Sequence, residues 1–189
     1  MSERSLRVLM LAPQPFFIER GTPIAVRAAA ETLARAGHTV DLLVYHLGEE
    51  IDLPENVRLV RMKPVPGVKR MRPGPTLAKL ACLVRFHAAA FRLAKRNRYD
   101  LVHAVEDGVF VAMRLRKKLG LPFVYDMDSL MSEQVAAKPG VGQIAGAVFA
   151  TLEQSAVRGA VHSLCVCPHL RDIAGRDARG GAIRGGKDI

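Results

Sequence analysis

Short apolar runs alternate along this sequence with longer segments in which apolar residues recur every three or four positions. The short runs are typical of buried strands and cover residues 6–12, 39–45, 57–62, 100–104 and 122–126. The longer segments are typical of helices and cover residues 23–37, 76–98 and 108–120. Because parallel strands require long crossover connections, this alternation predicts an α/β fold, a parallel sheet with helices on both of its faces.

Glycines and prolines mark the ends of these elements. Gly37 and Gly120 follow helical segments at the position of a left-handed C-terminal cap, and the proline-rich segment 63–75 is expected to be a loop. After Leu170 the apolar periodicity is lost and glycines become frequent. We therefore expect one domain over residues 1–174 and an irregular glycine-rich tail over residues 175–189, which has the composition of a truncated or frameshifted end.

The length and composition suit a single domain with its own core. The chain has 189 residues, of which 49% are hydrophobic. The N-terminal apolar run ends at Pro13 and is too short for a secretory signal, and the charge-free segment 139–152 is shorter than the roughly 20 residues that span a bilayer. Three cysteines, an odd number, favour a reducing compartment over a disulfide framework. These features predict a cytoplasmic protein.

A cluster of His and Cys near the C-terminus has two interpretations. His162, Cys165, Cys167 and His169 lie close together in the sequence, as the ligands of a zinc site could. The Cys-x-Cys spacing on one extended strand differs, however, from the paired knuckles of structural zinc sites. Small apolar cysteines in a last strand are therefore the favoured interpretation, and no metal or other cofactor is expected.

The net charge of +10 suggests an anionic partner, and the basic residues are concentrated in one region. Between Arg58 and Arg98 there are twelve Lys and Arg residues and no Asp or Glu. Nucleic acid is not expected as the partner, because no stacking motif or known binding fold accompanies the cations. In one interpretation the cations are the solvated side of a helix whose core face consists of Leu80, Leu83, Val84, Phe91 and Leu93.

The other interpretation of the basic region is a membrane surface. The loop "VKRMRP" places Val68 and Met71 among cations, which is typical of a segment that docks on anionic lipid. The expected membrane contacts are then Lys69, Arg70 and Arg72.

The loop after the first strand is a candidate ligand site, because ligands of parallel α/β sheets bind at the carboxyl ends of the strands. The segment "APQPFFIERGT" contains neither a P-loop nor the Gly-x-Gly-x-x-Gly pattern of dinucleotide sites. Gly21 allows the backbone to approach a ligand closely, and Thr22 with neighbouring amides could bind an anion or a sugar hydroxyl. The alternative is a helix cap without a ligand, with Thr22 as the N-cap and Pro23 as the first helical residue.

Acidic residues and a histidine follow two strands that are expected to be neighbours. Asp126 and Asp128 are two residues apart, so extended geometry points both carboxylates the same way. The preceding strand end supplies His103, Glu106 and Asp107. Such a rim can hold sugar hydroxyls or accept a proton. The alternative is that Asp107 and Asp126 cap the helices that follow them.

Three segments, taken in order, resemble the N-terminal half of a family 4 glycosyltransferase. They are "RVLMLAPQPFFIERGTPIAVRAAAETLARAGHTVDLLVY", "YDLVHAVEDGVFVAMRLRKKLGLPFVYDMDS" and "LCVCPHLRDIA". The first matches the glycine-containing loop, helix and "aGHeV" strand of that family, and the second matches its "DvvHah" strand, "lglP" turn and "vyD" strand. The resemblance covers Arg7 to about Ala174 and implies a Rossmann-like domain that is one half of a GT-B architecture.

The resemblance also implies roles for particular residues. Gly21 and Thr22 would contact substrate in the cleft between the two GT-B domains, and His103 and Glu106 would line the acceptor side. Independently of the resemblance, the strand-end position of Asp126 makes it a further expected substrate-binding residue. Asp128 stands where many relatives carry a histidine. Asp128 and His103 are therefore the candidates for the catalytic residue, which the resemblance does not itself identify.

The activity implied by the resemblance is a retaining, metal-independent transfer of a hexose from a nucleotide-sugar to a glycan or lipid-linked acceptor. The C-terminal domain that binds most of the donor in the family is not in this sequence. A second GT-B domain is thus expected in the parent protein, and this chain alone is expected to be inactive. If the membrane interpretation of the basic region holds, the cytoplasmic protein lies at the inner face of the membrane. The alternative is a free-standing Rossmann-like binding module that docks on anionic membrane through residues 58–98.

Overall fold

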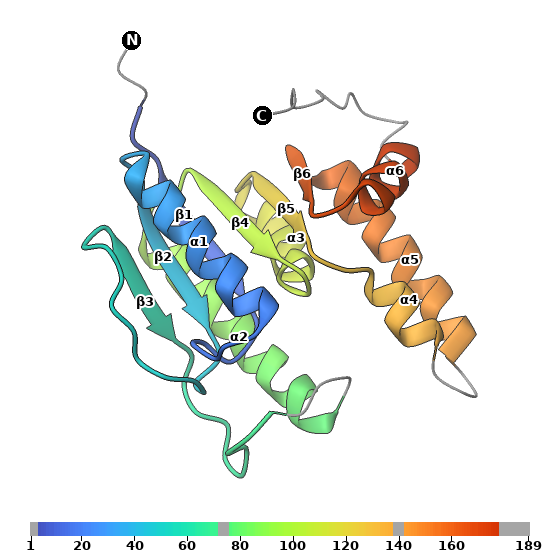
Figure 1. Cartoon of the computed structure of the whole chain (residues 1–189), viewed down its shortest axis with the longest axis horizontal. Coiled ribbons are helices and arrows are strands. Elements are labelled where there is room, and N and C mark those ends of the chain that lie inside the picture. The colour runs from blue at the N-terminus through green and yellow to red at the C-terminus, as the bar shows by residue number, and fades with distance from the viewer. Residues whose placement is uncertain (1–3, 72–75, 138–141, 178–189) are drawn as a thin grey trace.

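The computed structural model describes residues 4–71, 76–137 and 142–177. Its centre is a six-stranded parallel sheet with the strand order β3-β2-β1-β4-β5-β6 (Figure 1). The strands are β1 Arg7–Ala12, β2 Thr39–Val44, β3 Val57–Arg61, β4 Leu101–Val105, β5 Phe123–Met127 and β6 His162–Cys165. The first five agree with the expected runs to within one residue, which confirms the α/β fold.

Helices cover both faces of the sheet. They are α1 Gly21–Arg35, α2 Leu77–Arg96, α3 Gly108–Leu119, α4 Met131–Ala136, α5 Gly142–Gly159 and α6 Pro168–Asp177. Gly37 and Gly120 have φ values of 84° and 72°, which confirms the left-handed positions after α1 and α3. Within the described part of the chain, no helix combines the length and apolar character that crossing a bilayer requires.

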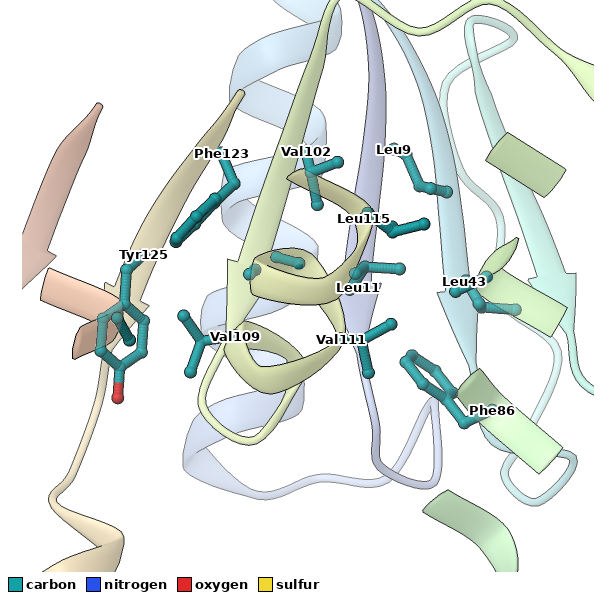
Figure 2. Close-up of a cluster of buried hydrophobic side chains, with 14 of the residues drawn as sticks. Leu9, Leu11, Leu43, Phe86, Val102, Val109, Val111, Leu115, Phe123 and Tyr125 are labelled. Atoms are coloured by element: carbon teal, nitrogen blue, oxygen red, sulfur yellow. The ribbon is translucent and has the colours of Figure 1, made fainter. Parts of the chain in front are cut away.

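The core consists of two clusters of buried apolar side chains, one on each face of the sheet. In the larger cluster, Leu9 and Leu11 of β1 face Val111 and Leu115 of α3, and Phe86 of α2 lies beside them (Figure 2). The cluster on the other face lies under α1, which contributes Val26, Ala30 and Ala34. The helices thus pack on the two faces of the sheet and fix the positions of the strand ends without covering them.

The core face of α2 differs from the expected one. Leu80 and Val84 were expected in the core, but both are more than half exposed. The buried residues are instead Cys82, Phe86, Ala89 and Ala90, while Leu83, Phe91 and Leu93 are partly buried. Three of the four buried side chains are small, so the helix lies close to the sheet, and Phe86 fills the remaining space. The sequence-based assignment was therefore wrong for Leu80 and Val84, whereas Phe91 and Leu93 do pack against the core cluster.

The C-terminal part is more ordered than the sequence suggests. Helix α6 continues to Asp177, so residues 175–177, expected to be irregular, are helical. Gln154 of α5 donates to Asp177 Oδ1 at 3.1 Å, and Arg158 donates to the Asp177 carbonyl at 2.9 Å. These contacts tie the end of α6 to α5. The rest of the expected tail, residues 178–189, lies outside the described residues.

The cysteine-rich segment forms the last strand only in part. Cys165 ends β6, whereas Cys167 lies beyond it, directly before α6. All three cysteines are free thiols. In residues 4–71, 76–137 and 142–177, no group of three or more His, Cys, Asp or Glu is placed to hold a metal ion.

The order of the strands determines where a ligand crevice forms. From β1 the chain proceeds to β2 and β3 on one side, and from β4 it proceeds to β5 and β6 on the other. The connections therefore diverge between β1 and β4, and the carboxyl ends of these two strands border an open space.

Candidate functional site

A cavity of about 350 Å³ lies at this divergence of the strands. Its wall combines the segment from the end of β1 to the start of α1, the residue after β2, the loop before α2 with the first turn of α2, and the residue after β4. The lining residues are Pro13, Gln14, Pro15, Ile18, Arg20, Gly21, Thr22, Pro23, Tyr45, Met71, Lys79 and Glu106. Four segments that are distant in sequence thus meet at one site.

Two side chains of this cavity carry buried polar atoms without a hydrogen-bond partner in the described structure. They are Gln14 Nε2 and Tyr45 Oη. The Tyr45 side chain is only 1% exposed and packs edge-on against Phe86, with the ring centroids 5.8 Å apart. Burial raises the pKa of Tyr45 well above its ordinary value, so the phenol stays protonated and can donate. A buried polar group without a partner is unfavourable by about 1–3 kcal/mol, which a bound hydroxylated ligand would relieve.

An ion pair separates this cavity from a smaller one. Lys79 Nζ of α2 lies 2.7 Å from Asp107 Oδ2, and both Lys79 and Glu106 line both cavities. The smaller cavity, about 50 Å³, is completed by residues of α3, β5, α4 and α5. Asp107 occupies the N-cap position of α3, but its side chain makes no cap hydrogen bond. The capping role considered for Asp107 is therefore wrong, because Lys79 takes its carboxylate instead.

Glu106 has an unusual backbone at the end of β4. Its φ of 44° lies in the left-handed region, which non-glycine residues seldom adopt. Ser129 Oγ donates to its Oε1 at 3.3 Å. Burial, and then the charges of Asp107 and Asp128, raise the pKa of Glu106. Strained backbone and a raised carboxyl pKa together are typical of functional sites.

The other expected site residues, His103, Asp126 and Asp128, form two neighbouring pairs: His103 with Asp126, and Asp128 with Thr22. His103 Nε2 lies 2.9 Å from Asp126 Oδ2, so Asp126 binds the histidine and does not cap a helix. Burial, and then the charge of Asp126, raise the pKa of Asp128, whereas a hydrogen bond with Thr22 lowers it. The structure thus brings Asp128, Asp126 and His103 together, with Thr22 linking them to the cavity. His103, Asp126 and Asp128 themselves do not line either cavity.

The start of α1 differs from the sequence-based alternative. The N-cap is Arg20, without a side-chain cap bond, and the helix begins at Gly21. Thr22 is therefore inside the first turn and is not the N-cap. A Cβ at Gly21 would meet no atom of the described residues within 4 Å, so none of their contacts requires glycine there. Gly21 and Thr22 both line the cavity, where a ligand could use this space.

The expected membrane contacts lie in the loop before α2. Lys69 and Arg70 are exposed, and Arg72 lies outside the described residues. Val68 and Met71, which were expected to face lipid, pack against the core cluster instead. Among the described residues of this region, the exposed large apolar side chains are Leu77, Leu80 and Val84, all of α2.

Three residues of the cavity were missed by the sequence analysis as ligand residues. Gln14 lies in the loop that was singled out, but its own position carried no signal. Tyr45 directly follows an apolar strand. A phenol hydroxyl at the end of a strand was the signal that could have identified it as a ligand residue. Lys79 was assigned to the solvated side of α2. Its ion pair with Asp107 joins two segments that are distant in the sequence, so no local pattern could indicate it.

Comparison with known protein families gives one match over most of the chain. A model of the glycosyl transferase 4-like domain matches residues 20–183. A search of curated protein sequences found no significant match.

Solved structures with the same fold are glycosyltransferases of GT-B architecture. Sucrose-phosphate synthase from Thermosynechococcus elongatus is 18% identical, with a TM-score of 0.68 over 92% of this chain and 45% of that one. UGT73P12 from Glycyrrhiza uralensis is 13% identical, with a TM-score of 0.60 over 91% and 47%. UGT89C1 from Arabidopsis thaliana, solved with UDP, is 13% identical, with a TM-score of 0.55 over 90% and 47%. This chain thus spans a little under half the length of each.

Proposed function

Because this chain belongs to the glycosyl transferase 4-like domain family, we propose that it is the acceptor-binding half of a retaining hexosyltransferase. The donor is a nucleotide-sugar and the acceptor is a glycan or a lipid-linked sugar. The observation that carries this proposal is the pair of partnerless buried polar atoms, Gln14 Nε2 and Tyr45 Oη, in the cavity at the strand divergence. A sugar supplies hydroxyls that both donate and accept, which suits an amide and a phenol.

The proposal assigns roles to the neighbouring residues. Gly21 and Thr22 contact substrate at the start of α1, and Glu106 and Asp126 bind substrate at the ends of β4 and β5. His103 and Asp128 are the candidates for proton transfer, since both lie in the cluster beside Thr22. The contact of Lys79 with Asp107 holds the wall between the two cavities.

The donor half of the reaction is proposed to belong to a second GT-B domain. The UDP in the similar Arabidopsis structure supports a nucleotide-sugar donor, and the half-length coverage supports a partner domain. We propose that this chain by itself holds the acceptor and does not turn over. No metal is assigned to the reaction.

The alternative is a free-standing binding module that takes a nucleotide-sugar by itself. Saturation-transfer NMR on the 189-residue chain separates the two, with methyl hexopyranosides and UDP-glucose as probes. The acceptor half should show transfer to the pyranoside protons and weak or no transfer to the uridine protons. Strong uridine transfer without pyranoside transfer would favour the binding module. Absence of both would contradict a sugar site in this cleft.

The two partnerless atoms lead to a prediction whose sign is unusual. Tyr45→Phe removes the partnerless Oη, and Gln14→Leu removes the partnerless Nε2 together with the amide oxygen. The free energy of unfolding should therefore stay the same or rise by up to about 1 kcal/mol. Pyranoside affinity should nevertheless fall about three- to tenfold, because each variant loses one ligand hydrogen bond. Chemical denaturation and NMR titration measure the two effects. Lower stability with unchanged affinity would show that these groups serve the fold.

Gly21 tests how closely the ligand approaches the backbone. Gly21→Ala adds a methyl group where the protein has open space, so stability should change by less than about 1 kcal/mol. If the ligand contacts this backbone, pyranoside affinity should fall about tenfold in Gly21→Val and less in Gly21→Ala. The matched control is Gly175→Ala, since Gly175 also has open space around it and lies in α6, outside the cavity lining. Equal affinity in the Gly21 variants would remove Gly21 from the site.

A further inference from the structure

We propose that the exposed face of α2 docks on an anionic lipid bilayer. This inference goes beyond the proposed function and does not depend on it. It starts from Leu77, Leu80 and Val84, which are 86%, 59% and 64% exposed. Their spacing of three and four residues places them within about 60° on the helix surface. They form a single apolar stripe, called the α2 stripe below.

The α2 stripe is a second apolar face and not an extension of the core. At about 100° per residue, its centre lies almost opposite the buried Cys82, Phe86 and Ala89. A surface helix of a globular protein normally has one apolar face. The first turns of α2 also project beyond the tips of the strands (Figure 1). Residues 4–71, 76–137 and 142–177 therefore leave this stripe open along the part of the helix that extends furthest from the sheet.

Cations border the α2 stripe. Arg85 and Arg92 lie beside it on the helix surface, and both are exposed. Arg85 Nη1 donates to the Pro64 carbonyl at 2.8 Å, which holds the loop with the exposed Lys69 and Arg70 against α2. No Asp or Glu occurs between Asn56 and Tyr99. An apolar stripe bordered by cations without acidic residues complements a bilayer surface that carries anionic headgroups.

A lipid surface fits this face better than a protein partner does. Three side chains cannot fill the roughly 800 Å² per partner that a standard protein interface buries. They are sufficient for an interfacial helix, which inserts its apolar side chains while Lys and Arg contact headgroups. Lys79, two residues after the first residue of the stripe, lines the cavity together with Met71. If the proposed function also holds, the acceptor would reach the cavity from the bilayer.

Vesicle co-sedimentation of the 189-residue chain tests this inference. The probes are vesicles of phosphatidylcholine alone and of equimolar phosphatidylcholine and phosphatidylglycerol. The wild type should bind the anionic vesicles, should lose binding at high salt, and should bind the neutral vesicles weakly. Leu77→Ser/Leu80→Ser/Val84→Ser should weaken anionic binding by about tenfold or more. Lys69→Gln/Arg70→Gln should weaken it by about tenfold.

Matched controls separate docking from general stickiness and from general charge. Ile144, Val148 and Leu152 form another exposed apolar row, on α5, so their triple serine variant should bind like the wild type. Lys117→Gln/Lys118→Gln removes the same charge from the exposed end of α3 and should have little effect. Circular dichroism checks folding, and the single variant Leu77→Ser is the fallback if the triple variant unfolds.

Three results would overturn the inference. They are binding to both vesicle types alike, equal losses in the control variants, and stripe variants that bind like the wild type. A stripe variant that changes a dimer into a monomer without affecting lipid would assign the stripe to self-association. NMR titration with pyranosides is independent of these results, so failure of the docking inference would leave the proposed function intact.

Discussion

Asp41→Asn is expected to lower the free energy of unfolding by about 3 kcal/mol, the lower end of the range for removing one partner of a buried ion pair. The Asp41 carboxylate is almost fully buried in β2. It accepts from Arg58 Nε at 2.7 Å, from Arg7 Nη2 at 3.2 Å and from Tyr99 Oη at 2.5 Å. Asparagine keeps the shape but leaves two guanidinium groups without a counter-charge. Because both arginine side chains remain partly exposed, water limits the loss.

The effect of Asp41 should depend on pH in a defined direction. Burial raises its pKa, but the hydrogen bonds from Arg58 and Tyr99 and the charges of Arg58 and Arg7 outweigh burial, so the pKa is lowered overall. A lowered folded pKa contributes stability that is complete above the unfolded value of about 3.9. That contribution is lost as the pH falls through the folded pKa. The stability difference between wild type and Asp41→Asn should therefore be constant near neutral pH and shrink below about pH 4.

The matched control for Asp41 is a carboxylate in an exposed ion pair. Glu50 accepts from Arg61 Nε at 2.9 Å, but its side chain is 82% exposed. Glu50→Gln should change stability by less than about 1 kcal/mol. Urea denaturation of the three proteins between pH 3 and pH 7 measures both effects. Equal losses for Asp41→Asn and Glu50→Gln would show that the buried cluster contributes no more than a surface pair.

The sheet could be predicted from the sequence because its signal is local. The central strands β1, β2 and β4 are short apolar runs that are buried on both sides, and the long helices repeat apolar residues at their own period. The strand order, however, depends on which runs become neighbours, and no local pattern specifies this. The position of the cavity between β1 and β4 follows from that order.

Of the candidate site, the sequence could predict only the residues that directly follow strands, and not the partners of these residues. Glu106 and Asp128 come directly after strands, so the sequence indicated their edge of the sheet. Their partners are 23 residues apart in one case, Ser129 with Glu106, and far more distant for Thr22 with Asp128. The N-cap expectation for Thr22 failed because the helix starts one residue before it, at Gly21.

Asp41 shows the limit of pattern-based interpretation from another direction. A single Asp in the apolar run "TVDLLV" was visible in the sequence, and such a residue must find charged partners when buried. Arg58 lies on β3 and Tyr99 precedes β4, so the partners become evident only in the folded sheet. The cluster therefore stabilises the sheet near the amino ends of its strands, whereas the cavity lies at their carboxyl ends.

Gly108→Ala is expected to destabilise the protein by about 2–3 kcal/mol, and Gly108→Val by more. A Cβ at Gly108 would lie 2.6 Å from the Leu11 carbonyl oxygen and 3.3 Å from Pro13 Cδ. Leu11 is in the buried strand β1, so its carbonyl cannot move aside without disturbing the sheet. Glycine thus allows α3 to begin against the end of β1.

The same close approach positions the cavity wall, because Glu106 and Asp107 directly precede Gly108. Displacing the start of α3 should move Asp107 away from Lys79, which it contacts at 2.7 Å. Gly108→Ala is therefore expected to weaken pyranoside binding as well as folding, whereas Gly21→Ala, with open space around its Cβ, should leave stability nearly unchanged. Thermal unfolding and NMR titration of both variants measure the contrast. If Gly108→Ala unfolded at the wild-type temperature, the backbone at this junction would have to be adaptable. The packing of α3 against β1 could then not be what holds the two strand ends around the cavity.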